Sequence, residues 1–247
     1  MTEARKDGQY DRVALLVPCL NEETAIGPMI RAVRAQGIRT IIVVDSNSTD
    51  ATAASAKDAG ATVVVEPRRG YGRAIQTGLA TLPAGADIVL FMDGDGSDRP
   101  DNIPAILEPL LEGRADFVHG TRLKGHREAG ALSLPQVVAG HLAGLLILAV
   151  YRVRFTDMSP YRAITRPALE RLGMRDETFG WNLEMQMRAA AAGLRIVELP
   201  VGQRRRMGGV SKVSGNIRVV ARAVWVITTT FIRLAMTLRR PHQANLR

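Results

Sequence analysis

The stretch that most constrains the fold is an apolar run that ends in two acids. Residues 88–92 (Ile-Val-Leu-Phe-Met) are typical of a short buried strand, and Asp93-Gly94-Asp95 follows directly. In an open α/β sheet the ligand crevice lies beyond the carboxyl ends of the strands, so both carboxylates are expected there. They suit a hard divalent cation that also takes phosphate oxygens, with Gly94 leaving room for a diphosphate. The same residue types also occur in solvated turns.

Short buried strands alternate with helical segments along the chain. Strands are expected at 13–17, 41–44, 62–65, 88–92, 115–119 and 195–199, and helices at about 25–36, 51–59, 74–81, 103–112 and 179–192. Such alternation with short connections predicts an α/β fold, with a mostly parallel central sheet flanked by helices. A chain of 247 residues can form one large domain or two small ones.

Polar clusters follow several of these strands, around Glu22, Asp45, Asp95 and Arg122. Any one of them is compatible with an ordinary loop. Together, on one edge of a parallel sheet, they describe a nucleotide pocket beside a metal site. The glycine-bearing basic segment 68–73 precedes a predicted helix, and a helix N-terminus suits a phosphate.

The charge of the chain is uneven. Residues 195–247 contain 11 Lys or Arg and a single acid, Glu198, whereas residues 1–194 sum to −1 within a total of +9. A basic C-terminal quarter implies an anionic partner, either a membrane surface, a phosphate or a nucleic acid. No helix-turn-helix, finger or stacking pattern accompanies this charge, so nucleic acid is not expected.

The basic charge gathers in two segments. Residues 204–212 (Arg-Arg-Arg-Met-Gly-Gly-Val-Ser-Lys) are either a solvated turn or a loop that closes on phosphates. A helix is expected from about 216 to 240, and it separates a cationic stripe from an apolar face. The stripe contains Arg218, Arg222, Trp225, Arg233 and Arg240, and the opposite face contains Val220, Ile227, Phe231, Leu234 and Leu238. We therefore expect a main domain at 1–213 and a basic amphipathic helix at 214–247, which docks on the body, on an anionic bilayer or on a second copy.

Several features bear on the compartment. The polar first dozen residues argue against a signal peptide, and the lone Cys19 fits a reducing compartment. The four histidines show no zinc spacing. No apolar run reaches the roughly 18 residues of a membrane span, so 137–151 is expected to be a buried core helix or to rest in the membrane interface. The chain is therefore expected to be cytoplasmic and peripheral at the cytoplasmic face of the membrane.

Six short motifs occur in a specific order. They are Val17-Pro18-Cys19-Leu20-Asn21-Glu22-Glu23, residues 41–52, Gly70-Tyr71-Gly72, Asp93-Gly94-Asp95, Gly120-Thr121-Arg122, and Arg206, Gly209, Ser211 and Lys212. In this order they resemble the motifs of family 2 glycosyltransferases with the Rossmann-like GT-A fold, over about residues 13–212. The resemblance is greatest to the polyprenyl-phosphate (dolichyl-phosphate) hexosyltransferases. Departures occur at Ser46-Asn47, at Ser97 and at 157–161.

The resemblance implies transfer of a hexose from GDP-mannose or UDP-glucose to a polyprenyl phosphate, with inversion. Mg²⁺ or Mn²⁺ would bind Asp93 and Asp95. Residues matched to donor binding are Pro18, Asn21, Glu22, Asp45, Asn47, Arg69, Gly70, Gly72 and Asp93. Cationic and hydroxyl side chains for the acceptor phosphate are Arg122, Arg204, Arg206, Ser211 and Lys212. Expected catalytic residues are Asp95 and Arg122, with Asp157 or Glu184 as general base where the acceptor is a hydroxyl.

Three rival functions remain open on the sequence. A family 2 enzyme of the same fold can glycosylate a soluble or glycan hydroxyl instead of a lipid phosphate. A nucleotidyltransferase also uses paired acids on a parallel sheet. A non-catalytic nucleotide-sugar binding protein would bind the donor without turnover, which the intact paired acids argue against.

Overall fold

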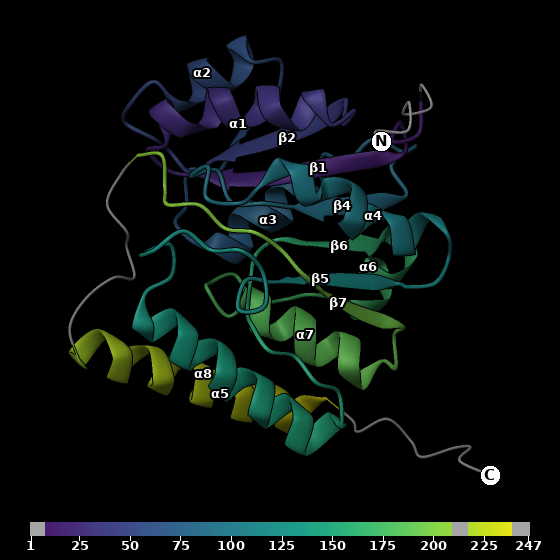
Figure 1. Ribbon diagram of the computed structural model, residues 1–247, viewed down its shortest axis with the longest axis vertical. Coiled ribbons are helices and arrows are strands. Elements are labelled where there is room, and N and C mark those ends of the chain that lie inside the picture. The colour runs from purple at the N-terminus through teal and green to yellow at the C-terminus, as the bar shows by residue number, and fades with distance from the viewer. Residues whose placement is uncertain (1–7, 209–216, 239–247) are drawn as a thin grey trace.

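The computed structural model describes residues 8–208 and 217–238. These residues form a seven-stranded sheet with helices on both faces (Figure 1). The strands are β1 (Val13–Cys19), β2 (Thr40–Asp45), β3 (Thr62–Val65), β4 (Ile88–Phe91), β5 (Phe117–Thr121), β6 (Arg162–Thr165) and β7 (Ile196–Pro200). The helices are α1 (Glu23–Ala35), α2 (Thr52–Asp58), α3 (Tyr71–Leu79), α4 (Ile103–Leu111), α5 (Leu134–Tyr151), α6 (Arg166–Leu172), α7 (Trp181–Ala191) and α8 (Ile217–Thr237), with a 3₁₀ turn at Pro100–Asn102.

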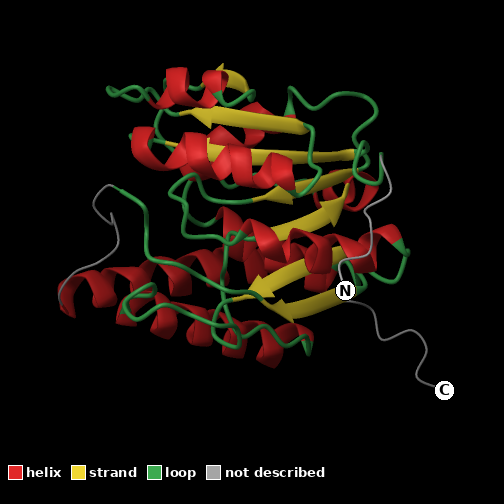
Figure 2. Ribbon diagram, turned by 45° about the horizontal axis from the view of Figure 1, so that its top comes forward, coloured by secondary structure: helices red, strands yellow, loops and turns green. Residues whose placement is uncertain are grey.

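The strand order is β3-β2-β1-β4-β6-β5-β7. Within the described residues, β6 pairs antiparallel with β4 and β5, and the other pairings are parallel. This confirms the predicted mostly parallel sheet, which is also visible as the array of arrows in Figure 2. Since Cys19 lies opposite Asp45 and Leu16 opposite Phe91, the segments that follow β1, β2 and β4 meet at one edge.

Side-chain alternation along the strands builds a core on each face of the sheet. Leu15 and Val17 point to one face, where apolar side chains of α1 and α4 pack, and Leu16 and Phe91 point to the other. The second core is the larger and includes residues from α3, α5, α6, α7 and α8. In Figure 1, α5 and α8 lie side by side as an outer layer beyond α7, in agreement with the packing of α8 against both helices.

The apolar segment near residue 140 is longer than expected. Helix α5 starts at Leu134 and runs for 18 residues. Its N-cap Ser133 forms a capping box with Gln136. By length and composition it is therefore able to cross a membrane, which corrects the expectation that no such segment exists. Core helices pass the same test, and Ala143, Ile147 and Tyr151 of α5 are buried in the second core.

Two elements are absent from the sequence expectations. Strand β6 (Arg-Ala-Ile-Thr) is short and begins with a charged residue, and the seven-residue α6 follows it directly.

Helix α3 begins at Tyr71 rather than at Ala74, so Gly72 is helical and not part of the preceding loop. Strand β5 lies two residues later than expected.

The predicted C-terminal helix is present as α8. Its Ile227, Phe231 and Leu234 are buried as the apolar face, whereas Trp225 is 69% exposed. Arg233 pairs with the buried Asp176, with 2.8 Å between Nη2 and Oδ2, so this member of the cationic stripe contacts protein. The side chains of Val220, Arg218 and Arg222, and residues Ser211, Lys212 and Arg240, lie outside what the structure describes. The boundary between 1–213 and 214–247 stays a prediction.

Candidate active site

The turn after β4 gathers three acids. Asp95 is buried and accepts the backbone N–H of Ser97 at 2.9 Å. Asp93 is half-buried, and its backbone N–H donates to Oδ2 of Asp98 at 3.0 Å. Asp98 is itself buried, so side-chain acceptors fold this turn tightly at the carboxyl end of β4. Two of the three acids are the predicted metal ligands, and the third was not foreseen.

Negative charge is concentrated in this turn. Burial, and then the neighbouring carboxylates of Asp95 and Asp98, raise the pKa of Asp93 well above its usual value, against the opposing effect of Arg122 and Arg206. Burial is also the main cause that raises the pKa of Asp98 to about 7. Within the described residues no three His, Cys, Asp or Glu side chains form a complete metal site. The acids nevertheless fit a divalent cation that completes its shell with substrate and water oxygens.

Arg206 places the described part of the basic segment, residues 204–208, against these acids. Its Nη2 lies 2.6 Å from Oε1 of Glu22, and its Nε lies 3.2 Å from Oδ2 of Asp95. The segment is fastened by backbone hydrogen bonds from Arg204 to the Ser97 carbonyl (2.9 Å) and from Met207 to the Asp95 carbonyl (3.0 Å). The structure thus joins Glu22, Asp95 and Arg206, which lie far apart in the sequence.

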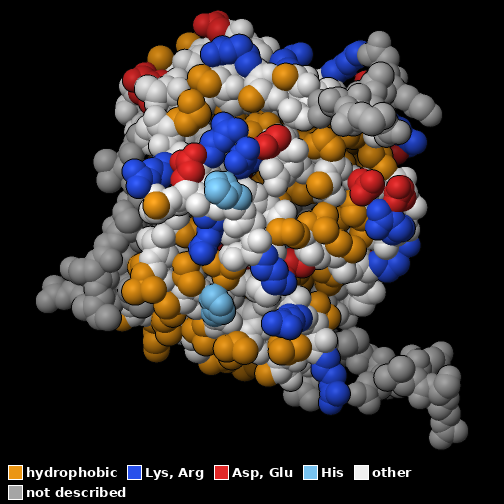
Figure 3. Space-filling model, in the orientation of Figure 1, with side chains coloured by type: hydrophobic (Ala, Val, Ile, Leu, Met, Phe, Trp, Pro, Cys, Tyr) orange, Lys and Arg blue, Asp and Glu red, His pale blue; other side chains and the backbone are white. Residues whose placement is uncertain are grey.

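Further cationic side chains surround this segment. Arg204 and Arg205 are exposed, as are Lys124 and Arg127 of the loop after β5. Gln203 connects the two segments, because its N–H donates to the His126 carbonyl at 2.9 Å and its carbonyl accepts from Glu128 at 3.0 Å. Figure 3 shows Lys and Arg side chains spread over one face of the molecule, among acidic and apolar ones.

Arg122 and Asp157 form a buried bidentate ion pair. The Nε–Oδ2 distance is 2.7 Å, the Nη2–Oδ1 distance is 2.8 Å, and the backbone N–H of Arg122 also donates to Oδ2 at 3.0 Å. Hydrogen bonds from Arg122, opposed by burial, lower the pKa of Asp157 to about 2. A carboxylate bound in this way is a weak base, so the geometry argues against Asp157 as general base. Arg122 uses Nε and Nη2 in this pair, and its expected role toward an acceptor phosphate stays a prediction.

Glu184 is also engaged. It is buried, accepts the backbone N–H groups of Arg175 (3.0 Å) and Asp176 (2.7 Å), and pairs with Arg188 one turn along α7 at 2.7 Å. These contacts hold the 175–180 loop against α7. The geometry therefore argues for a structural role of Glu184 rather than the expected role as general base.

The expected donor contacts lie at the ends of β1 and β2. Asp45 is buried and accepts both the N–H (3.2 Å) and the hydroxyl of Ser48. Asn21 and Asn47 both have positive φ angles, of 55° and 60°. Asn21 accepts the N–H of Thr49 at 2.9 Å, which ties the two turns together. Pro18 lies within β1, opposite Val44, and does not end the strand as expected.

The glycines have a packing role that the sequence does not reveal. A Cβ on Gly72 would overlap the carbonyl oxygen of Asp176, and one on Gly70 would overlap that of Glu177. The N–H of Gly72 also donates to the Thr178 carbonyl at 3.1 Å. These glycines therefore allow the start of α3 to approach the 175–180 loop, whereas Arg69 beside them is exposed.

Gly94 shows the same kind of requirement, because a Cβ there would overlap Sγ of Cys19. The close approach at Gly94 is thus made by the neighbouring strand β1. The expected room for a diphosphate is not what this glycine provides in the structure.

Two further residues near the acids went unnoticed in the sequence. The hydroxyl of Tyr71 lies 3.4 Å from Oδ1 of Asp93. Arg162, at the start of β6, is buried and donates to the carbonyl oxygens of Ser159 and Asn182. Burial lowers the pKa of Arg162 to about 10. Tyr71 lies inside the glycine motif, Asp98 follows the acidic run, and Arg162 ends the polar cluster 157–162, so all three had a local signal, but the strand that Arg162 begins was not expected.

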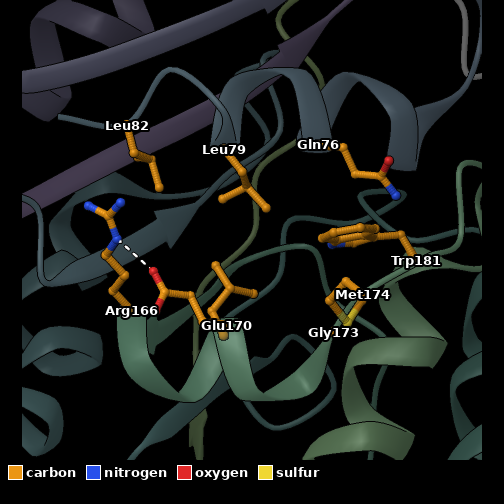
Figure 4. A pocket seen from close by; sticks show the side chains of 9 residues that line it. Gln76, Leu79, Leu82, Arg166, Glu170, Gly173, Met174 and Trp181 are labelled. Carbon is orange, nitrogen blue, oxygen red and sulfur yellow. Dashed lines mark hydrogen bonds and ion pairs between the residues drawn. The ribbon is translucent and has the colours of Figure 1, made fainter. Parts of the chain in front are cut away.

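A separate cavity of about 250 Å³ lies between α3, α6 and the start of α7 (Figure 4). Its walls are mostly apolar and include Leu79, Leu169 and Trp181, with the Arg166–Glu170 ion pair at one side. None of the acids described above lines it. It is therefore not the candidate active site.

Comparison with known proteins decides the family. The model of the family described as "Glycosyl transferase family 2" matches residues 14–173. This chain belongs to glycosyl transferase family 2. It is therefore an enzyme, a glycosyltransferase, and the acids after β4 and the turns after β1 and β2 fall within the matched region.

Relatives agree with this assignment. An uncharacterised glycosyltransferase of Mycobacterium tuberculosis is 42% identical over 210 residues, covering 84% of this chain and 92% of that protein. An undecaprenyl-phosphate mannosyltransferase of Micrococcus luteus is 30% identical over 221 residues, covering 83% and 89%. The crystal structure of M. tuberculosis glucosyl-3-phosphoglycerate synthase with Mn²⁺, UDP-glucose and phosphoglyceric acid superposes with a TM-score of 0.73 at 22% identity, covering 93% of this chain and 82% of that chain. This last likeness supports the GT-A fold of the glycosyltransferase.

Proposed function

We propose that this glycosyltransferase transfers one hexose from a nucleotide sugar, GDP-mannose or UDP-glucose, to a polyprenyl phosphate, with inversion at the anomeric carbon. The observation that carries the proposal is that both expected general bases, Asp157 and Glu184, are held in buried ion pairs. An acceptor hydroxyl needs a base, whereas a phosphate monoester with a second pKa of about 6 is already largely anionic at neutral pH.

Such an acceptor needs cations, and the site supplies them. Arg206 lies on Glu22 and Asp95, and the exposed Arg204 lies on the same segment. Arginine binds phosphate through paired hydrogen bonds. The M. luteus relative is named an undecaprenyl-phosphate mannosyltransferase, which supports the same acceptor class.

The residues around the acids would act as follows. Asp93 and Asp95 would hold Mg²⁺ or Mn²⁺, which supplies charge neutralisation for the departing nucleoside diphosphate. Asp98 keeps the backbone of Asp93 in place. Arg206 pairs with Glu22 and Asp95 in the structure, and it would donate to the acceptor phosphate when the substrates are bound. The turns at Asn21 and Asp45 would position the nucleoside.

The outer helices support a peripheral position at the membrane. Apolar side chains are exposed on both α5 and α8, among them Leu134, Leu145, Trp225, Ile232 and Met236. Two such neighbouring helices beside a basic chain end suit the interface of an anionic bilayer. A lipid phosphate would then be presented at the surface on which the enzyme rests.

The test is a matrix of donors and acceptors with the purified enzyme. GDP-mannose and UDP-glucose are each combined with undecaprenyl phosphate in detergent, and with the soluble acceptor phosphoglyceric acid. We expect one donor to give a lipid-linked hexose with Mn²⁺ or Mg²⁺ and none after EDTA treatment. Turnover of phosphoglyceric acid without turnover of the lipid would reject the proposed acceptor, and binding of a donor without turnover of any acceptor would reject catalysis.

A further inference from the structure

An aromatic pair lies beside the acids on the side of the 175–180 loop. The ring of Phe179 stacks on that of Tyr71, with centroids 6.3 Å apart and 23° between the ring planes. Tyr71 in turn reaches Asp93 through its hydroxyl. Phe179 is 70% exposed, so the order from the acids outward is Asp93, Tyr71, Phe179.

A single exposed phenylalanine needs no explanation in itself. Phe179 differs because its position is fixed on both sides. Thr178 donates its N–H and hydroxyl to Oδ1 of Asp176, each at 2.7 Å, and accepts from Gly72. On the other side Gly180 and Trp181 are buried. The loop thus holds a large apolar side chain in solvent at the rim of the acid site.

The same loop is joined to the outer helices. Asp176, which accepts from Thr178, also pairs with Arg233 of α8 at 2.8 Å. The exposed apolar side chains Trp225 and Ile232 belong to that helix. Phe179 therefore lies on a loop that connects the acid site to the apolar surface of α8.

We propose that Phe179, stacked on Tyr71, binds the first isoprene units of the acceptor and makes the enzyme selective for phosphates that carry a hydrocarbon chain. This rests on the proposed acceptor class. The transferred sugar is bonded to the diphosphate, so it must lie against the acids, on the side of Tyr71 that faces Asp93. The chain of a lipid phosphate must instead lead outward, and Phe179 is the apolar surface it meets on the way to α8. Contact with hydrocarbon buries the exposed ring.

The test measures binding, so that it does not depend on turnover. Dimethylallyl, geranyl and farnesyl phosphates are kept below their critical micelle concentrations and titrated calorimetrically into the full-length protein. The protein solution contains Mn²⁺ and GDP or UDP, whichever raises the melting temperature of the protein. We expect the wild type to bind geranyl phosphate at least about tenfold more tightly than dimethylallyl phosphate. Phe179→Ala is expected to lose most of this gain, and Phe179→Leu to keep most of it.

Two controls separate this role from a structural one. Leu111→Ala removes another exposed apolar side chain, on α4, and is expected to leave the chain-length dependence unchanged. The nucleotide affinity and the melting temperature of Phe179→Ala are expected to match the wild type. An unchanged chain-length dependence in Phe179→Ala, a loss of nucleotide affinity instead, or a wild type that binds all three phosphates equally would each overturn the inference.

The two proposals fail in different ways. Absence of hexose transfer to every prenyl phosphate would reject the proposed function, while a chain-length gain that disappears in Phe179→Ala would still establish the hydrocarbon contact. Conversely, hexose transfer to undecaprenyl phosphate would support the proposed function. If Phe179→Ala then showed the same dependence of affinity on chain length as the wild type, the role of Phe179 would be rejected.

Discussion

At the scale of single residues, the same side-chain types have different roles according to their partners. Asp95 and Asp157 are both buried near the carboxyl edge of the sheet. Asp157 is bound by Nε and Nη2 of Arg122, whereas Asp95 shares Arg206 with Glu22. Removing one partner of a buried ion pair leaves an uncompensated charge, which is costly.

The Arg122–Asp157 pair is therefore expected to be a major source of stability. Asp157→Asn should lower the free energy of unfolding by about 3–5 kcal/mol, because the Arg122 charge stays buried without its partner. The matched control is Glu170→Gln in the exposed Arg166–Glu170 pair, where about 0.5 kcal/mol or less is expected. Urea denaturation measures both, and equal effects of the two variants would contradict the structural role.

The pH dependence of this pair has a definite sign. The pKa of Asp157 is lowered from 3.8 to about 2 on folding, so its contribution to stability is present above the unfolded pKa. It is lost as the pH falls from about 5 toward 2, when the folded carboxyl takes up its proton. Urea midpoints between pH 2.5 and 6 should fall toward acid more steeply in the wild type than in Asp157→Asn. Parallel profiles would show that Asp157 is not a source of the dependence.

At the scale of elements, the sequence predicts what depends on local patterns. Apolar runs located β1, β2, β3 and β4, and the acids after β4 follow from that strand alone. Strand β6 was missed because its four residues begin with Arg162, a charged side chain whose burial depends on distant carbonyl groups. The engagement of Asp157 by Arg122, 35 residues away, likewise has no local signal.

The glycines at the start of α3 show how one element fixes another. Gly72→Ala should destabilise the protein by about 1–3 kcal/mol, since its Cβ would overlap the carbonyl oxygen of Asp176. Gly85→Ala is the control, because no atom lies within 4 Å of a Cβ at that position. Thermal or urea unfolding distinguishes the two. A neutral Gly72→Ala would show that the 175–180 loop yields easily and does not hold Phe179 in place.

At the scale of the whole molecule, the enzyme has two distinct sides. One core, beneath α1 and α4, supports the turns at the sheet edge, and the other lies beneath the α5–α8 layer with its exposed apolar side chains. The sequence predicted that α8 is amphipathic, but it did not predict that α8 packs against α5. Their association into one layer is a tertiary contact that periodicity does not show.

This layer is expected to bind anionic membranes. The wild type should co-sediment with vesicles containing phosphatidylglycerol more than with phosphatidylcholine alone, and less at high salt. Trp225→Ala combined with Met236→Ala should weaken binding several-fold, because both side chains are exposed on α8. Leu111→Ala on α4 serves as the control. Equal sedimentation of all three proteins would place the membrane contact elsewhere or exclude it.

The reversed direction of β6 has an evolutionary consequence. At the carboxyl edge of parallel strands only the segments that follow the strands are present, as after β1, β2 and β4. Because β6 runs oppositely between β4 and β5, its incoming segment, which contains Asp157 and Ser159, reaches that same edge. We therefore expect that insertions or deletions before β6 would reshape this part of the edge while the turns after β1 and β2 keep their lengths.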